Sequence, residues 1–134
     1  MDLATEPVSG AGLSVRTADG IATAEVSGEL DISWSPALRE QLLSVLRRGS
    51  SRLVIDLSRV TYCDVSGLVV LVGTGHRARL LGGSLRLAAI SPQVEQVLHA
   101  TGLHAHFDVF ATVHAATAGA QGPADDPSAR DSAA

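Results

Sequence analysis

The residues with the clearest potential for chemistry lie between a strand-like apolar run and a long helix-like one, in the sequence Asp64-Val65-Ser66-Gly67-Leu68. A hydroxyl at the start of a helix lies near unpaired backbone N–H groups and the positive end of the helix dipole. Ser66 has two alternative roles there. It can cap the helix by accepting a hydrogen bond from an amide, which is the commoner role of serine at this position. It can also carry a phosphoryl group, which would gain amide donors and a favourable dipole.

The neighbours of Ser66 have alternatives of their own. Asp64 either places Ser66 for a kinase or caps the amides of its own turn. Gly67 permits either the close approach of a partner backbone or a tight turn. Asp31 and Trp34 should lie on the same side as Ser66 if the strands there are parallel. Trp34 is either an interface contact or a core residue over the first helix.

Enzymatic interpretations have less support. Ser66 is not in a Gly-x-Ser-x-Gly nucleophile motif, because position 64 is Asp. Four histidines have a spacing that metal sites use, with two of them expected on one face of a strand: His99, His104, His106 and His114. Asp108 is the one carboxylate flanking them, so solvated or capping histidines are favoured. We expect no catalysis, no metal and no cofactor.

The elements that must position these residues alternate between strands and helices. Asp19-Gly20 suits a two-residue hairpin turn, and Ser35-Pro36 and Ser91-Pro92 are each typical of a helix that a serine caps. The expected strands span 13–18, 21–30, 52–57, 85–90 and 107–110, and the expected helices 35–49, 66–81, 91–102 and 111–118. Strands joined by single helices pair in parallel, whereas the opening hairpin is antiparallel. The predicted fold class is α/β, a mixed, largely parallel sheet of four to five strands covered by about four helices.

Composition excludes several classes of protein. The chain has 134 residues, of which 46% are apolar and 18% charged, an ordinary balance for one globular domain. Its net charge of −4 gives no electrostatic footprint for nucleic acid. No apolar run reaches the ~18 residues of a membrane span. The single cysteine, Cys63, is expected to be a small buried apolar residue and fits a reducing cytoplasmic location.

The two ends of the chain differ in composition from its middle. Residues 1–11 and 119–134 have no periodic apolar pattern, so we expect a flexible N-terminal tail and a disordered C-terminal tail around one domain at 12–118. The tails hold the acidic excess, because residues 11–118 contain nine Arg and nine acidic residues. On a neutral domain, one added phosphate would be a large change in charge.

Four segments occur in order: Gly28-Glu-Leu-Asp31, the run from Leu53 to Leu68, Gly82-Gly83, and the run from Ser91 to Leu103. In residues and spacing they resemble the STAS domain, which sulfate transporters and anti-sigma-factor antagonists share. Within that family the chain is similar to free-standing bacterial anti-sigma-factor antagonists. Their signature reads Asp, Ser, Ser or Thr, Gly, Leu, and its second hydroxyl is phosphorylated. Ser66 keeps that hydroxyl, whereas Val65 replaces the first.

The resemblance implies a regulatory switch in transcription. When unphosphorylated, the protein would bind an anti-sigma factor, which is also a serine kinase, and so free a sigma factor for RNA polymerase. The residues expected at this surface are Asp31, Trp34, Asp64, Val65, Ser66, Gly67 and Leu68. Phosphorylation of Ser66 would add about −1.5 to −2 charges and eject the partner, because an unpaired buried charge is unfavourable by several kcal/mol. A metal-dependent serine/threonine phosphatase would reset the switch.

An alternative from a different class stays open. The chain would then be a STAS adaptor subunit of a membrane transporter or of a stress-sensing complex without a sigma-factor cascade. The sequence also leaves open whether the protein forms a homodimer. The replacement of a hydroxyl by Val65 leaves the preferences of a kinase and a phosphatase undetermined.

Overall fold

A five-stranded sheet, ordered β1-β2-β3-β4-β5, organises residues 12–120, the part of the chain that the computed structural model describes. Its strands are β1 Gly12–Ala18, β2 Ile21–Leu30, β3 Arg52–Cys63, β4 Ser84–Ala88 and β5 Asp108–Phe110. The helices are α1 Ser35–Arg47, α2 Val65–Leu80, α3 Pro92–Thr101 and α4 Val113–Ala120, with a short 3-10 helix, η2, at Leu103–His106. β1 is antiparallel to β2 and the other neighbours are parallel. The predicted fold class and element order are confirmed.

The opening hairpin forms as the sequence predicts. Asp19 and Gly20 have φ angles of 54° and 77°, the positive values that a two-residue type I′ turn requires at both central positions. The register that follows pairs Ala18 with Ile21 and Gly12 with Ser27. β1 is thereby fixed as an edge strand beside β2.

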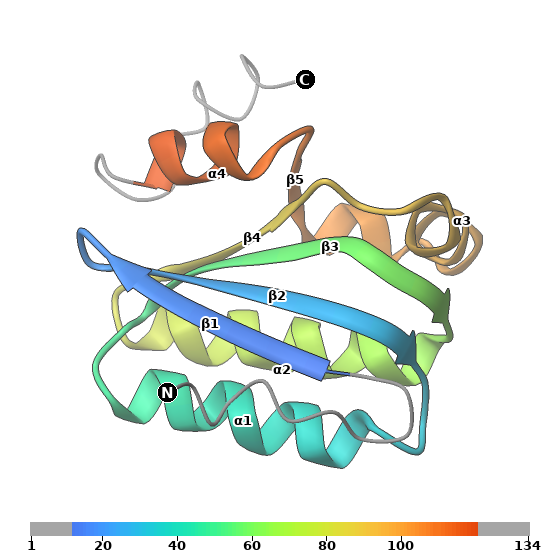
Figure 1. The fold of residues 1–134 in the computed structure, drawn as a ribbon, viewed down its shortest axis with the longest axis horizontal. Coiled ribbons are helices and arrows are strands. Elements are labelled where there is room, and N and C mark those ends of the chain that lie inside the picture. Colours follow the sequence, from blue (N-terminus) through green and yellow to red (C-terminus); the bar gives the residue numbers. More distant parts are fainter. Residues whose placement is uncertain (1–11, 121–134) are drawn as a thin grey trace.

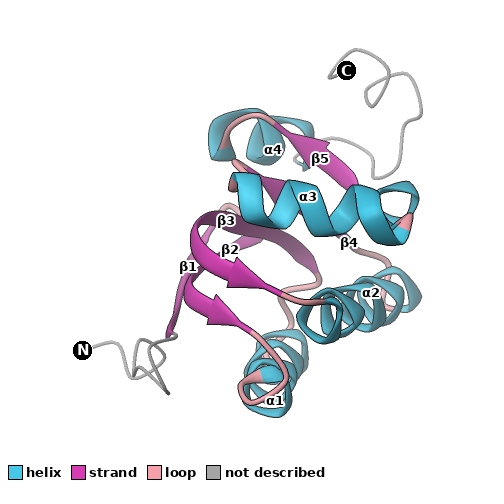
Figure 2. Ribbon diagram, turned by 90° about the vertical axis from the view of Figure 1, so that its right-hand side faces the viewer, coloured by secondary structure: helices cyan, strands magenta, loops and turns pink. Residues whose placement is uncertain are grey.

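The helices cover the sheet unequally. Helices α1, α2 and α3 lie against one face of the sheet (Figures 1 and 2), as right-handed crossovers between successive parallel strands require. Their side chains share one large core with that face. The fully buried members from these helices include Leu38, Leu42, Leu68, Leu71, Val94 and Leu98. Helix α4 packs on the opposite face over a smaller cluster, composed of Ile21, Val54, Ala88, Phe110 and Ala116.

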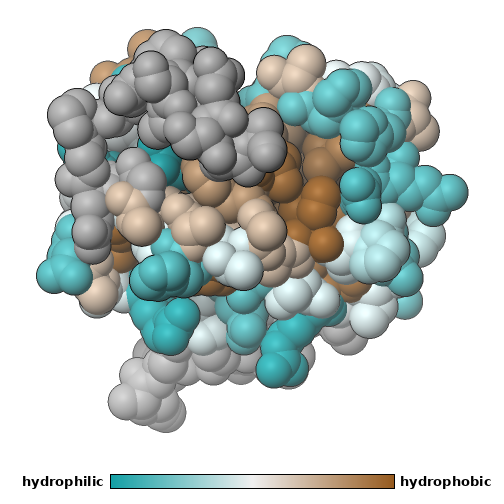
Figure 3. Space-filling model, turned by 90° about the horizontal axis from the view of Figure 1, so that it is seen from above, coloured by the Kyte–Doolittle hydropathy of each residue, from teal (hydrophilic) through white to brown (hydrophobic). Residues whose placement is uncertain are grey.

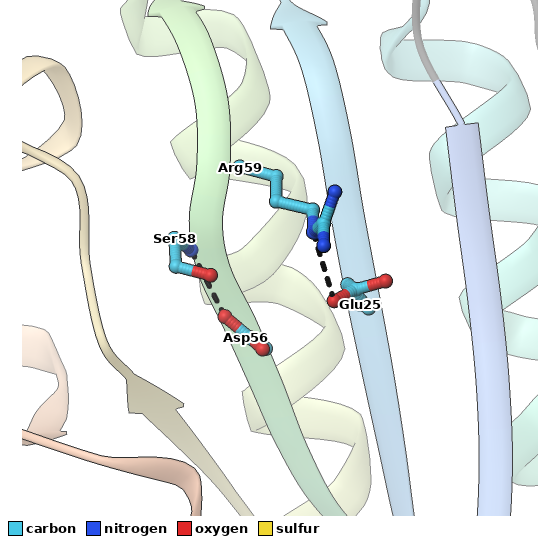
Figure 4. A network of polar contacts seen from close by, with 4 residues as sticks. All are labelled: Glu25, Asp56, Ser58 and Arg59. Carbon is cyan, nitrogen blue, oxygen red and sulfur yellow. Dashed lines mark hydrogen bonds and ion pairs between the residues drawn. The ribbon is translucent and has the colours of Figure 1, made fainter.

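The rest of that second face is polar along β2 and β3. Arg59 Nε lies 3.3 Å from Glu25 Oε2 across the two strands, and the Asp56 carboxylate accepts a hydrogen bond from the Ser58 N–H at 2.9 Å (Figure 4). The Arg59 and Glu25 side chains are 70% and 44% exposed, so their ion pair contributes about 1 kcal/mol or less. Seen from above, the surface also shows an apolar area near its middle, with hydrophilic side chains to the right of it and below it (Figure 3).

Several boundaries differ from the sequence prediction. Strand β3 continues to Cys63, well past the expected end at residue 57. Residues 103–106, expected to lead into a strand, form η2. The two ends predicted to be tails, 1–11 and 119–134, lie outside the described residues, except that 119 and 120 are the last positions of α4.

Candidate functional site

The candidate site lies where two parallel strands end and two helices begin. The carboxyl ends of β2 and β3 reach the same edge of the sheet, and α1 and α2 start from that edge (Figure 1). The backbone N–H of Asp64 donates to the carbonyl of Leu30 at 3.1 Å. This hydrogen bond joins the loop after β3 to the end of β2, so the segment at Asp31 and the segment at Ser66 are held together.

Asp64, and not Ser66, caps helix α2. The Asp64 carboxylate accepts hydrogen bonds from the backbone N–H of Ser66, at 3.0 Å, and from the Ser66 hydroxyl. The helix starts at Val65, so Ser66 is its second residue. The interpretation of Ser66 as the capping residue is therefore wrong, and that of Asp64 as a cap of its own turn is confirmed. The side chain of Ser66 is half-buried at the surface.

Ser35 connects Asp31 to Ser66. Its hydroxyl oxygen lies 2.9 Å from the Asp31 carbonyl oxygen and 3.2 Å from Ser66 Oγ. The sequence predicts Ser35 to be the cap of α1, but this serine is the first residue of the helix and Trp34 occupies the cap position without a side-chain hydrogen bond. The link confirms that Asp31 and Ser66 lie on the same side of the molecule.

The Asp31 carboxylate stabilises the turn before α1. It accepts hydrogen bonds from the backbone N–H of Ser33 at 3.0 Å and from its hydroxyl at 2.7 Å. These bonds favour the ionised form, and the hydrogen bond from the Ser33 hydroxyl is the largest cause of a pKa of Asp31 below its ordinary value. The same turn holds Ile32 on the surface.

Four large apolar side chains are exposed on the segments that meet at this edge: Ile32, Tyr62, Val65 and Val69, with exposed fractions of 73%, 51%, 46% and 55%. We call these four residues the apolar rim. Val65 and Val69 lie four positions apart and so share one face of α2. Of the four, only Val65 is among the residues that the sequence predicts at the partner surface. Apolar residues exposed next to a polar group mark interaction surfaces when they gather in one place.

Three residues expected at the partner surface are buried. Trp34 is 1% exposed, Leu68 is fully buried, and Gly67 is buried as well. A Cβ atom at Gly67 would lie 2.4 Å from Leu30 Cγ. The close approach that Gly67 permits is therefore to Leu30 of the same chain and not to a partner. Trp34 is a core residue, which is the other alternative that the sequence allows for it. The side chains of Trp34 and Leu68 therefore pack inside the domain and are not available to a partner.

Cys63 lies directly beneath the site. Its thiol is buried, and burial together with the nearby Asp64 carboxylate raises its pKa to about 12. The thiol is therefore protonated and a poor nucleophile at neutral pH. The expectation of a small buried apolar residue is confirmed.

The histidines lie away from this edge. His104 and His106 belong to η2, so the prediction that they share a strand face is wrong. The rings of His99 and His104 stack with their centroids 4.6 Å apart. Within residues 12–120, no group of three or more His, Cys, Asp or Glu side chains is arranged to hold a metal ion.

The fold defines a small α/β domain, and its candidate site combines the hydrogen-bonded pair Asp64 and Ser66 with exposed apolar side chains. The family model of the STAS domain matches residues 13–116, and the chain belongs to the STAS domain family. This family membership confirms the resemblance on which the sequence-based prediction of function depends.

Individual relatives are anti-sigma factor antagonists. The anti-sigma-B factor antagonist of Bacillus subtilis is 37% identical over 86 residues, which cover 64% of this chain and 78% of the relative. The anti-sigma-F factor antagonist RsfB of Mycobacterium tuberculosis is 31% identical over 114 residues, covering 82% and 91%. A crystal structure of an anti-sigma factor antagonist from Mycobacterium paratuberculosis superposes with a TM-score of 0.76 at 29% identity, covering 84% of this chain and 95% of that one.

None of the helices in the described part of the chain combines the length and the apolar composition that a membrane span needs.

Proposed function

We propose that this protein is an anti-sigma-factor antagonist, that Ser66 is its phosphoacceptor, and that the apolar rim is where the anti-sigma factor docks. The observation that carries the proposal is the position of Ser66. Its hydroxyl is half-buried at the surface, its direction is set by Asp64, and exposed Val65 and Val69 flank it on the same helix. The names of the relatives supply the class of partner.

The geometry suits Ser66 as an acceptor of a phosphoryl group. The hydroxyl hydrogen points at the Asp64 carboxylate, so the oxygen lone pairs remain for Ser35 and for an incoming phosphorus atom. The partner, a serine kinase in this proposal, brings the ATP. The product phosphate lies at the positive end of the α2 dipole, which favours an anion.

The apolar rim provides the energy of docking. Burial of a valine- or isoleucine-sized side chain contributes about 1.5–3 kcal/mol, and the four rim residues lie on three segments that meet at the same edge of the sheet as Ser66. The rim is therefore able to bind a partner with a complementary apolar surface, which then covers Ser66. Binding by the unphosphorylated form would release the sigma factor from the anti-sigma factor.

Phosphorylation reverses this binding by placing charge in an apolar interface. The hydrogen-bonding partners of Ser66 in residues 12–120 are Asp64 and Ser35, neither of which carries a positive charge. The phosphate adds about −1.5 to −2 charges. Burying that charge without a cation is unfavourable by about 3 kcal/mol, which corresponds to a ~100-fold loss of affinity. A metal-dependent serine/threonine phosphatase then restores the unmodified protein in the cytoplasm.

The test is phosphorylation by a cognate anti-sigma kinase with ATP, followed by the intact mass of the protein. The expected result is one added phosphate on the unmodified chain and on Ser33→Ala, and none on Ser66→Ala. Ser33 is the matched control, because its hydroxyl also donates to an aspartate two residues before it. No added phosphate on the unmodified chain, or a phosphate that persists in Ser66→Ala, would refute the assignment of Ser66.

A further inference from the structure

We propose that Ser35 is a positioning residue that transmits the phosphorylation state of Ser66 to the Asp31–Trp34 turn, which carries Ile32 of the apolar rim. The inference rests on the proposed role of Ser66 and adds a regulatory connection to it. Ser35 is 8% exposed, and its hydroxyl lies between an atom of the turn and an atom of the phosphoacceptor. A single side chain therefore contacts both.

The hydroxyl hydrogen of Ser35 can be donated either to the turn or to Ser66, but not fully to both. Ser66 has one hydroxyl hydrogen, and the Asp64 carboxylate accepts it. The contact between Ser35 and Ser66 therefore needs the hydrogen of Ser35. That single hydrogen has two acceptors, the Asp31 carbonyl at 2.9 Å and Ser66 Oγ at 3.2 Å. The shorter distance places it mainly on Asp31 in the unmodified protein.

The Asp31 carbonyl belongs to the turn that places Ile32. It also accepts hydrogen bonds from the backbone N–H groups of Trp34 at 3.2 Å and Ser35 at 3.0 Å. The Ser35 hydroxyl is therefore a third donor to this carbonyl, and its departure leaves the two backbone donors in place. The turn would loosen without losing its hydrogen bonding altogether.

Phosphorylation changes which acceptor is stronger. The phosphoryl group from ATP replaces the hydroxyl hydrogen of Ser66, which leaves as a proton, and ADP is released. The new group presents anionic oxygens next to Ser35 Oγ, and a hydrogen bond to an ion is about twice as strong as one to a neutral carbonyl. The Ser35 hydrogen then moves from Asp31 to the phosphate. The partner surface is altered in two ways, by the charge at Ser66 and by release of the turn at Ile32.

The test installs phosphoserine at position 66 during translation, by amber suppression, so that no kinase is needed. It is made in the unmodified background and in Ser35→Ala, Ser35→Cys and Ser33→Ala. Phosphorus NMR follows titration of the phosphate, and amide NMR follows residues 31–34. Ser35→Cys keeps a side chain of similar size with a weak hydrogen-bond donor. If Ser35→Ala does not fold, the phosphate pKa measured in Ser35→Cys is the test of the proposal. Ser33→Ala removes a hydroxyl of the same turn whose hydrogen bond goes to Asp31.

A donor to the phosphate stabilises its dianion, so loss of the Ser35 hydroxyl should raise the second phosphate pKa by about 0.5, a ~3-fold change in proton affinity. The amide shifts that phosphoserine causes at Ile32 and Ser33 should shrink in the same variants. Ser33→Ala should retain the lower phosphate pKa. An unchanged phosphate pKa in a folded Ser35 variant would overturn the proposal. That result would leave the kinase assay on Ser66 unaffected, and a failed kinase assay would leave this measurement unaffected.

Discussion

The Asp64 carboxylate binds Ser66 twice, through the backbone N–H at 3.0 Å and through the hydroxyl. One side chain therefore both starts helix α2 and orients the hydroxyl that we propose to be phosphorylated. Phosphorylation removes the hydroxyl donor and places a second anionic group, with about −1.5 to −2 charges, beside that carboxylate. The backbone hydrogen bond remains, so the helix start can persist while the surface changes. A switch of this kind alters the electrostatics of the site more than the fold.

Ser66→Ala and Ser66→Glu should separate the two states of the proposed switch. Alanine leaves the helix cap intact, because Asp64 provides it. We therefore expect Ser66→Ala to bind the anti-sigma factor as tightly as the unphosphorylated protein, with an affinity that ATP does not change. Glutamate brings one negative charge next to the apolar rim. We expect the affinity of Ser66→Glu for the anti-sigma factor to be at least about 10-fold lower than that of the unphosphorylated protein. Titration calorimetry with the purified partner measures both. Equal affinities of the two variants would contradict ejection by charge.

Val69→Asp tests the apolar rim directly. This side chain is 55% exposed on the first turns of α2, so a charge there should leave the fold intact and weaken partner binding at least about 10-fold. Leu80→Asp is the matched control, because Leu80 is 73% exposed at the other end of the same helix. Its partner affinity should stay within about 2-fold of the unmodified protein. Similar losses in both variants would show that the rim is not the docking surface.

Gly67→Ala should destabilise the protein for a steric reason. The new Cβ would lie 2.4 Å from Leu30 Cγ and 3.1 Å from the Leu30 carbonyl oxygen, and forced overpacking of this kind lowers the free energy of unfolding by about 1–3 kcal/mol. A methyl group at Gly73, in the same helix, would have no atom of another segment within 4 Å. Gly73→Ala should therefore raise the free energy of unfolding by about 0.8 kcal/mol through helix propensity. Urea denaturation measures the free energy of unfolding of both variants. A change of the same sign in Gly67→Ala and Gly73→Ala would contradict the steric argument.

Local signals in the sequence predict much of the fold correctly. Ser91 caps α3 by accepting a hydrogen bond from the Val94 N–H, and Gly102 ends the helix with a φ of 77°. These features depend on residues only a few positions apart, so a short stretch of sequence determines them. The order of strands and helices follows from the same kind of signal, and parallel pairing follows from the order.

Ser35 shows where local signals fail. Ser35-Pro36 and Ser91-Pro92 have the same pattern, yet Ser91 caps its helix and Ser35 does not. The Ser35 hydroxyl instead contacts Ser66 Oγ, 31 positions along the chain. A contact over that distance in sequence arises from the pairing of β2 with β3. The residues next to Ser35 in the sequence carry no information about that pairing. Val69 of the apolar rim is missed for a related reason, since an apolar residue in a helix is assigned to the core until the packing is known.

The buried thiol of Cys63 predicts a decline of stability at alkaline pH. Its pKa is raised from 9.0 to about 12 in the folded protein by burial and by the Asp64 charge. The unfolded chain therefore loses the thiol proton first as pH rises. The contribution of the thiol to stability is complete below pH 9 and is lost progressively between pH 9 and 12. Below that range, alkylation of the native thiol should be slow compared with the unfolded chain.

Cys63→Ala isolates this effect, because the variant keeps every other titrating group. Urea denaturation at a series of pH values should show the free energy of unfolding falling more steeply above about pH 9 in the unmodified protein than in the variant, since the variant has no thiol to ionise on unfolding. Alanine also removes a sulfur atom from the core, which lowers stability at every pH and does not alter the slope. Parallel curves for the two proteins from about pH 8 to 11 would mean that the thiol ionises as readily in the folded protein as in the unfolded chain.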